Sequence, residues 1–233
     1  MFQSLRAKSG ALVREVHYRG IWKFLKFKYF EHYYRRKFRN MGVVHPDGNF
    51  DLEDTNARSV HNDAHPNHAS SFYHLKKVFQ KTGLPATGIH LLDIGCGDGR
   101  VLNMAMLLQV NEVFGVELDR IASESARRNC ETMSRNGYKV PWQVGKNDAT
   151  VYKIPDTVNL IYLFNPFGKK TMEAVVMNII EHAQQKKEPL FVAYCIPGFP
   201  ELFTEQACCE NIYQTFNVQG DHSDMVIFSI HKR

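Results

Sequence analysis

The sequence predicts an α/β protein in which a doubly wound, mostly parallel sheet ends in an antiparallel hairpin and is preceded by a basic helical arm. Short apolar runs alternate with helical stretches between residues 90 and 195. Two further β-prone runs follow with no helix between them, and the excess positive charge lies before residue 43. Alternating strands and helices are typical of a parallel sheet with helices on both faces, whereas two strands joined by a turn pair antiparallel.

Residues 1–42 form a segment whose charge differs from that of the rest. They contain 11 Lys and Arg against 2 Asp and Glu, so they carry a net charge of +9 and leave −4 for the remainder of a chain whose total is +5. They also hold 10 of the 28 aromatic residues. Residues 13–38 are rich in helix formers, but their apolar side chains wrap most of the way round, so no clean amphipathic stripe is predicted.

Four interpretations of this arm are open. A helix packed on the core as an extra layer is the simplest, and the opposite charges of arm and core favour it. An anionic membrane surface would attract the Lys and Arg side chains and place Trp and Tyr at the interface. Nucleic acid, an open but not a favoured partner, would use phosphate contacts and base stacking. The arm could also contact an acidic protein or a second copy of the chain.

Residues 43–69 separate the arm from the core. They are polar and broken by two His-Pro pairs and an Asp-Gly pair, which indicates an irregular connector. We therefore divide the chain into an arm of residues 1–42, a connector of residues 43–69 that is a candidate cofactor lid, and a core of residues 70–233.

The core begins with a helical pattern from Ser70, with Phe72, Leu75 and Phe79 on one face and Gly83 as its end. Apolar runs then predict buried strands at residues 90–94, 112–117, 159–164 and 190–195. Helical patterns between them lie near residues 100–109, 120–136 and 171–184. The last two strands are expected at residues 213–217 and 225–231, around a Gly-Asp turn.

Composition excludes several classes of protein. With 44% apolar and 23% charged residues, the chain is neither collagen-like nor disordered. Its five cysteines show no CxxC spacing, which favours a reducing compartment. No apolar run approaches the roughly 18 residues of a membrane span, and no secretory leader is visible. We expect a cytoplasmic protein, with peripheral membrane attachment left open.

A glycine-rich turn carries most of the functional information. The segment LLDIGCGDGR, residues 91–100, is an apolar strand followed by three alternating glycines and a helix. Glycines allow a sharp turn and close approach to a ligand, and a helix N-terminus presents free N–H groups. The dinucleotide fingerprint GxGxxG would require glycine at position 100, where the chain has Arg100. The next strand ends in Glu117, at the distance where such folds bind ribose hydroxyls.

These residues resemble class I S-adenosylmethionine-dependent methyltransferases. The resemblance rests on LLDIGCGDGR, on VFGVELD at residues 113–119, on Asp148 and on the segment LFNPF at residues 163–167, and it covers about residues 65–231. It implies a seven-stranded sheet whose last strand is antiparallel, and S-adenosylmethionine as cofactor. No metal is implied.

The resemblance also implies roles for individual residues. Asp93 would bind near the methionine amino group, Glu117 would accept both ribose hydroxyls, and Asp148 would accept the adenine amino group near the Ala149 amide. Cys96 is interpreted as a small space-filling residue rather than a nucleophile. The implied cofactor-binding residues are Asp93, Gly95, Cys96, Gly97, Gly99, Glu117, Leu118, Asp148, Ala149 and Asn165.

The segment Asn165-Pro166-Phe167 bears on the methyl acceptor. Amine-methylating relatives carry Asn/Asp-Pro-Pro-aromatic, whose oxygen atoms accept the amine hydrogens. Here the motif is one residue short, which puts transfer to nitrogen in doubt. The first hypothesis is a nitrogen acceptor on a protein side chain or small amine, with Asn165, Pro166 and Phe167 as the catalytic set. Transfer to a hydroxyl of a small molecule or glycan and a non-catalytic scaffold are the alternatives.

Histidines cluster in the connector, before the first core helix. His65 is a candidate general base, because a hydroxyl acceptor usually needs a base within hydrogen-bond reach. His61, Asp63 and His68 are its neighbours, but the segment has neither a cysteine partner nor HExxH spacing. A metal site is therefore not expected.

Overall fold

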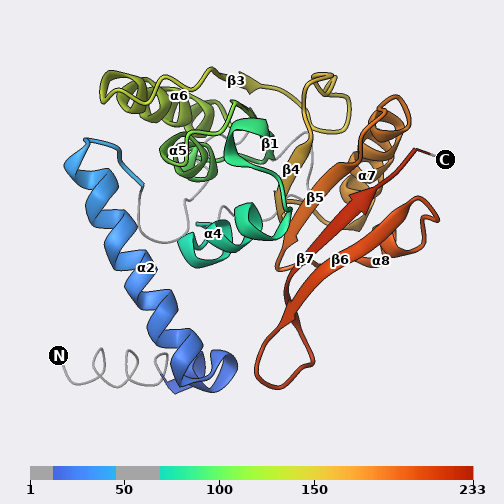
Figure 1. The fold of residues 1–233 in the computed structure, drawn as a ribbon, viewed down its shortest axis with the longest axis horizontal. Helices are drawn as coiled ribbons and strands as arrows, with labels where there is room; N and C mark the ends of the chain where they lie inside the picture. The colour runs from blue at the N-terminus through green and yellow to red at the C-terminus, as the bar shows by residue number, and fades with distance from the viewer. Residues whose placement is uncertain (1–12, 46–68, 233) are drawn as a thin grey trace.

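A single mixed sheet organises the molecule (Figure 1). The computed structural model describes residues 13–45 and 69–232, and within those ranges seven strands form one sheet in the order β3-β2-β1-β4-β5-β7-β6. The strands are β1 His90–Ile94, β2 Glu112–Glu117, β3 Trp142–Lys146, β4 Leu160–Phe164, β5 Leu190–Cys195, β6 Cys209–Phe216 and β7 Ser223–Ile230. The first five pair in parallel, and β7 pairs antiparallel with both β5 and β6. This confirms the predicted fold class.

Helices cover both faces of the sheet. Because strand side chains alternate, Leu91 of β1 packs into one apolar core and Leu92 into the other. The first core lies under α2, α4, α5 and α6, and the second lies under α7 and α8. The helix bounds are α2 Ile21–Asn40, α4 Phe72–Lys81, α5 Arg100–Leu107, α6 Arg120–Arg135, α7 Lys169–Gln184 and α8 Glu201–Thr204, with a short 3-10 helix at Ala86–Gly88.

The two edges of the sheet differ from the sequence-based expectation. The residue pattern did not single out β3, in which Val144 is the one buried residue. At the other edge, β6 begins at Cys209 rather than near Tyr213, and its register with β7 shifts between Asn211 and Tyr213. Both strands have a solvent-facing side, so they lack the continuous apolar run of a central strand.

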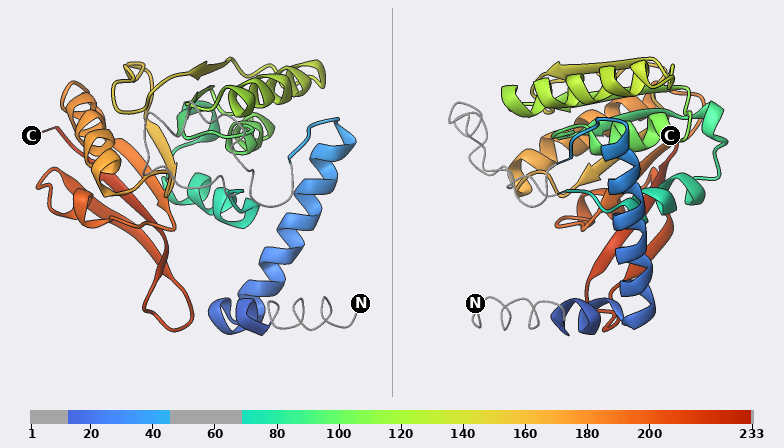
Figure 2. Two further views of the ribbon diagram at one scale, coloured as in Figure 1. Left: turned by 180° about the vertical axis from the view of Figure 1, so that it is seen from behind. Right: turned by 90° about the vertical axis from the view of Figure 1, so that its left-hand side faces the viewer.

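The arm is packed on the core. Residues 13–19 are helical, Gly20 breaks the helix at a φ of 74°, and α2 then runs along α4 at the edge of the molecule (Figures 1 and 2). Phe24, Tyr34 and Phe38 of α2 are buried, and Lys23 forms an ion pair with the fully buried Asp224 of β7. These contacts support the first of the four interpretations of the arm.

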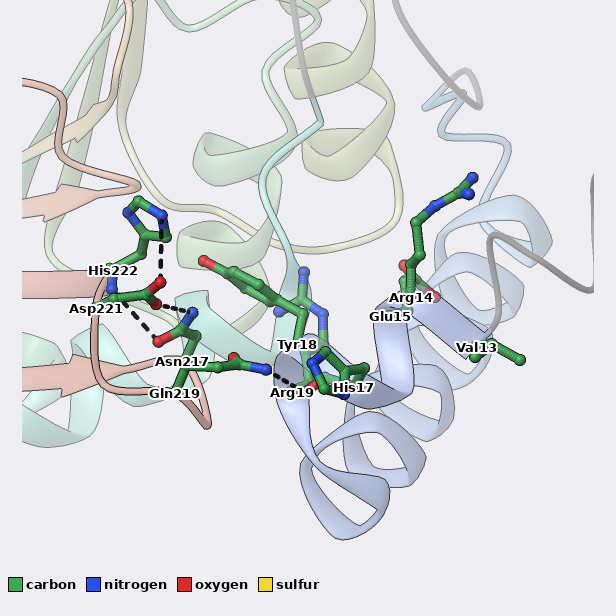
Figure 3. Close-up of a pocket in the computed structure, with 10 residues that line it drawn as sticks. All are labelled: Val13, Arg14, Glu15, His17, Tyr18, Arg19, Asn217, Gln219, Asp221 and His222. Carbon is green, nitrogen blue, oxygen red and sulfur yellow. Dashed lines mark hydrogen bonds and ion pairs between the residues drawn. The ribbon is translucent and has the colours of Figure 1, made fainter.

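The start of the arm also contacts the loop between β6 and β7. The Val218 backbone N–H donates to the Tyr18 carbonyl at 2.9 Å, and the Gln219 side-chain amide donates to the His17 carbonyl at 2.9 Å. A groove of about 810 Å³ lies between these two segments (Figure 3). Its lining comes from residues 13–19 and 217–222, so it is separate from the glycine turn.

Burial of His74 on α4 makes the protein sensitive to acid. Its side chain is 2% exposed, and burial lowers its pKa from 6.5 to about 4. An unfolded chain therefore binds a proton at His74 that the folded protein rejects, and folding stability falls as pH drops from 6.5 towards 4. The expected loss is about 3 kcal/mol at pH 4. The charged groups that act on His74 are Asp224, Arg19, Lys23 and Lys77.

The measurement is urea unfolding of wild type and His74→Leu between pH 7 and pH 4. Over that range the free energy of unfolding of wild type should fall by about 3 kcal/mol more than that of His74→Leu. His222→Leu is the matched control, because the His222 side chain is 71% exposed. Parallel pH curves for wild type and His74→Leu would contradict the prediction.

Candidate cofactor and acceptor site

The candidate site lies at the carboxyl ends of β1 and β4. The chain adds β2 and β3 on one side of β1 and then returns to place β4 and β5 on the other side, so the order reverses between β1 and β4. In open α/β sheets a ligand binds in the crevice at such a reversal. The glycine turn follows β1 there, and Asn165 follows β4.

Left-handed backbone conformations shape the glycine turn. Gly95, Gly97 and Gly99 have φ values of 77°, 52° and 81°. A Cβ on Gly95 would lie 3.2 Å from the Pro166 Cβ, and one on Gly99 would lie 3.1 Å from the Ala126 Cα. Glycine is therefore required by conformation and by close contact with the end of β4 and with α6.

Asp93 supplies a buried acceptor near the carboxyl end of β1. It is 2% exposed, and its Oδ2 has no hydrogen-bond partner among the residues that the structure describes. Burial, followed by the nearby charges of Glu117 and Asp98, raises the pKa of Asp93 well above its ordinary value. An unpaired buried acceptor fits a cationic ligand group such as the amino group of methionine. The residue is thus suited to its predicted role.

Glu117 is held against the glycine turn. Its Oε2 accepts the Gly97 N–H at 2.8 Å, and its Oε1 accepts the Asp119 N–H at 3.0 Å. Burial raises the pKa of Glu117, and these backbone hydrogen bonds oppose the rise. Each carboxylate oxygen can accept a further hydrogen bond, so the group can still receive ribose hydroxyls. Leu118, also predicted to bind the cofactor, is partly buried next to it.

The loop after β3 fixes the other predicted acid. Asp148 Oδ1 accepts the Thr150 N–H at 2.9 Å and the Thr150 hydroxyl at 2.7 Å. Ala149 is buried, and the Asn178 side-chain amide of α7 donates to its carbonyl at 3.3 Å. Sequence reasoning did not identify Asn178, because nothing in the local pattern of α7 links it to this loop.

Cys96 is a packing residue in this site. It is 4% exposed, and a Cβ on Gly115 would lie 2.8 Å from its Sγ. Burial, followed by the charge of Asp93, raises the pKa of the Cys96 thiol well above its ordinary value. A nucleophilic cysteine needs a lowered pKa, so these properties support the space-filling interpretation.

Tyr194 positions Asn165 at the end of β4. Asn165 has a φ of 40°, and its Oδ1 accepts the hydroxyl of the buried Tyr194 at 3.2 Å. That hydroxyl in turn accepts the N–H groups of Gly198 at 3.2 Å and Phe199 at 3.4 Å. A Cβ on Gly198 would lie 2.6 Å from Asn165 Oδ1, so the two loops are in close contact. Sequence reasoning missed Tyr194, which lies within an apolar strand.

Pro166 and Phe167 continue from Asn165 into the N-terminus of α7. Both are partly buried, and Phe167 packs against the core on the α7 side of the sheet. Pro166 contacts the glycine turn through Gly95, as described above. The segment is therefore placed next to the turn, as its predicted role requires.

The arm and the start of the connector fix the outer side of the glycine turn. His45 Nδ1 lies 2.9 Å from Asp98 Oδ2, and the His45 side chain is 4% exposed. Arg100 forms an ion pair with Glu31 of α2, and Glu31 also accepts the Phe72 N–H at 2.7 Å. These partners are distant in sequence, and no motif identified them.

Two expectations concern other parts of the chain. His65 and the rest of the histidine cluster lie outside the described residues. Within residues 13–45 and 69–232, no group of three or more His, Cys, Asp or Glu side chains is arranged to hold a metal ion. In the same ranges, no helix combines the length and apolarity needed to cross a membrane.

Comparison with known proteins gives a family and a fold. The sequence model of the methyltransferase small domain matches residues 55–189, more than half of the chain. No curated protein matches the sequence.

Solved structures share the fold at low identity. The "putative methyltransferase yhhF" from Escherichia coli has a TM-score of 0.57 and 15% identity, covering 71% of this chain and 90% of its own. A "putative RNA methyltransferase" from Pyrococcus horikoshii has a TM-score of 0.55 and 14% identity, covering 84% and 97%. An O-methyltransferase fragment, StiE O-MT, has a TM-score of 0.52 and 12% identity, covering 85% and 81%. At these identities the likeness concerns the fold, and the acceptor must be argued from the residues of the site.

Proposed function

Because the chain belongs to the methyltransferase small domain family and is an S-adenosylmethionine-dependent methyltransferase, we propose that it methylates a nitrogen atom of a protein side chain or small amine. One observation carries this proposal. Asn165 places a side-chain amide oxygen at the carboxyl end of β4, beside the glycine turn, and Tyr194 fixes its orientation at 3.2 Å.

The residues of the crevice have distinct tasks in this proposal. Asp93 would hold the amino group of the cofactor, Glu117 its ribose hydroxyls, and Asp148 with Ala149 its adenine. When bound, S-adenosylmethionine supplies a methyl group on a sulfonium, so the protein mainly has to align the acceptor.

Asn165 suits an amine better than a hydroxyl acceptor. A side-chain amide oxygen can accept an N–H of a neutral amine and so orient the nitrogen lone pair. An amide oxygen is not a base, and a hydroxyl acceptor usually needs one. Phe167 and Pro166 would form the wall against which the acceptor packs.

A long polyanionic acceptor fits the molecule less well. Residues 43–233 carry a net charge of −4. The Pyrococcus horikoshii neighbour is described as an RNA methyltransferase, but its 14% identity does not extend that acceptor to this chain. We therefore place RNA among the outcomes of the test rather than in the proposal.

The test is an acceptor screen with S-adenosylmethionine labelled on its methyl group. Extract from cells that lack the protein is incubated with it, separated into protein, RNA, lipid and small-molecule fractions, and the labelled atom is identified by mass spectrometry. Label on an amine nitrogen in the protein or small-molecule fraction is the expected result. Label on oxygen or in RNA would overturn the proposed acceptor. Cofactor binding without transfer to any fraction would favour the scaffold alternative.

Variants of Asn165 and Tyr194 test the acceptor contact once an acceptor is known. Asn165→Ala should lower kcat/KM about a hundredfold, because the acceptor loses its orientation. Tyr194→Phe should lower it roughly tenfold, since one positioning hydrogen bond is lost. Tyr194→Phe should bind S-adenosylmethionine with an affinity close to that of wild type, which calorimetry can measure.

Tyr138→Phe is the matched control for Tyr194→Phe. Tyr138 is partly buried against the other core and lies away from the crevice. Equal kinetics for Tyr194→Phe and Tyr138→Phe would show that Tyr194 does not position Asn165.

A further inference from the structure

The outer face of α2 exposes a row of apolar and aromatic side chains. Ile21, Leu25, Tyr29 and Tyr33 follow one another at intervals of four residues and are 50%, 49%, 63% and 46% exposed. Trp22, next to this row, is 76% exposed. Residues four apart lie on one side of a helix, so the row extends about 18 Å along α2. We call these five residues the outer row.

The exposed charged residues of α2 itself are all basic. Lys26, Arg36 and Arg39 are exposed on α2. The acidic groups of the described arm are engaged elsewhere, because Glu31 pairs with the buried Arg100 and Glu15 pairs with Lys28 at 2.8 Å. The surface is therefore cationic as well as apolar, and it is complementary to an anionic partner.

The outer row faces away from the core and from the candidate cofactor site. The opposite side of α2 contacts the core through Phe24, Tyr34 and Phe38, and through Glu31 to the first residue of α5. Figures 1 and 2 show α2 at the edge of the molecule, with α4 between it and the sheet. A partner on the outer row is thus about one helix diameter, roughly 10 Å, farther from the glycine turn than α2 itself. The outer row therefore does not guide a methyl acceptor to the glycine turn.

The chemistry of the row favours lipid over nucleic acid. Ile21 and Leu25 have no planar face and cannot stack on bases, so exposing them gains nothing in contact with RNA. At a bilayer surface the same side chains enter the boundary of the acyl chains, Trp22 and the two tyrosines fit the headgroup level, and Lys and Arg contact anionic headgroups. A straight helix at the molecular edge can lie along such a surface over its full length.

We propose that the outer row of α2, with Lys26, Arg36 and Arg39, binds the surface of an anionic phospholipid bilayer with the helix axis in the plane of the membrane. The methyltransferase would then work at a membrane surface. This inference does not depend on the nature of the methyl acceptor, because the residues that carry it contact neither the glycine turn nor Asn165.

The test is sedimentation of the full chain with phosphatidylcholine vesicles and with vesicles of phosphatidylcholine and phosphatidylglycerol at about 7:3. At about 0.1 M salt the partition coefficient should be at least about tenfold higher for the anionic vesicles, and it should fall as salt rises. Lys26→Glu/Arg36→Glu should lower it by at least about 25-fold. Trp22→Ser/Leu25→Ser should lower it by at least about tenfold, because apolar area is lost.

Matched controls change residues of the same chemical class, basic or apolar, outside the arm. Arg128→Glu/Lys187→Glu alters two exposed basic residues on the core, and Ile121→Ser/Met177→Ser alters apolar side chains that are 42% and 60% exposed. Both controls should sediment like wild type. Every variant should retain the circular dichroism and the S-adenosylmethionine affinity of wild type, because none of these residues lies in the crevice.

Trp22 provides a second readout. The chain has two tryptophans, so Trp142→Phe leaves Trp22 as the single indole. Its emission should shift to the blue with anionic vesicles and not with neutral ones. Equal binding to both vesicle types, equal losses in the core controls, or an unshifted emission would overturn the proposal. The proposal would also be overturned if a tRNA-sized RNA displaced the protein from the vesicles and if this displacement required the same outer-row residues.

Discussion

Replacing Glu117 by alanine is expected to weaken S-adenosylmethionine binding at least about a hundredfold while the fold is retained. The carboxylate would accept two ribose hydroxyls, and hydrogen bonds to a charged group contribute about 1.5–3 kcal/mol each. It also accepts the Gly97 N–H at 2.8 Å, so its loss frees the glycine turn as well. Isothermal calorimetry with S-adenosylmethionine and with its demethylated product measures the effect.

The same strand offers the control. Glu112 opens β2, lies 3.3 Å from His90 Nδ1 and sits at the far end of the strand from the crevice. Glu112→Ala should therefore bind the cofactor like wild type. Adding Asp148→Ala to Glu117→Ala should reduce affinity further. Affinity within about threefold of wild type in that double variant would contradict the proposed cofactor site.

Replacing Lys23 by methionine is expected to destabilise the protein by about 3–5 kcal/mol. Lys23 pairs with Asp224, whose side chain is fully buried, and it also donates to the Phe216 carbonyl at 3.0 Å. Methionine would keep the apolar stem and leave a carboxylate buried without a cation. Urea unfolding followed by far-UV circular dichroism at pH 7 gives the free energy of unfolding.

Two further variants make this result specific. Lys26→Met changes an exposed lysine about one turn farther along the same helix and should alter stability by less than about 0.5 kcal/mol. Lys23→Met/Asp224→Asn removes the stranded charge and should recover part of the loss. Similar losses for Lys23→Met and Lys26→Met would show that the ion pair contributes little.

The central strands could be predicted from the sequence because they are buried on both faces. The bounds of β1, β2 and β5 agree with the predicted residues 90–94, 112–117 and 190–195. Strand β3 was missed because, of its five residues, Val144 alone is buried. The signal that defines a strand weakens at an edge, where one side of the strand meets solvent.

The predicted site residues belong to continuous motifs, and the missed ones do not. Asp93, Glu117 and Asn165 could be proposed because each stands at a strand end within a recognisable segment. Tyr194 and Glu31 act through contacts that only the folded chain creates, at separations of 29 and 69 residues from Asn165 and Arg100. Neither residue has a local pattern that reports its partner.

The structure explains why the sequence of α2 shows no amphipathic stripe. Apolar residues lie on two sides of α2, with Phe24, Tyr34 and Phe38 facing the core and the outer row facing solvent. A periodicity analysis averages the two sides, so the helix looks apolar nearly all round. The folded structure distinguishes the two apolar sides of α2, because one packs on the core and the other faces solvent.

Docking of the arm has a consequence for synthesis of the chain. Lys23 leaves the ribosome before its partner Asp224, which follows 201 residues later. At translation rates of about 5–20 residues per second, roughly 10–40 s pass before the ion pair can form. Throughout that interval the arm cannot complete its native contact with β7, and the mutual repulsion of its Lys and Arg side chains opposes aggregation of the nascent arm.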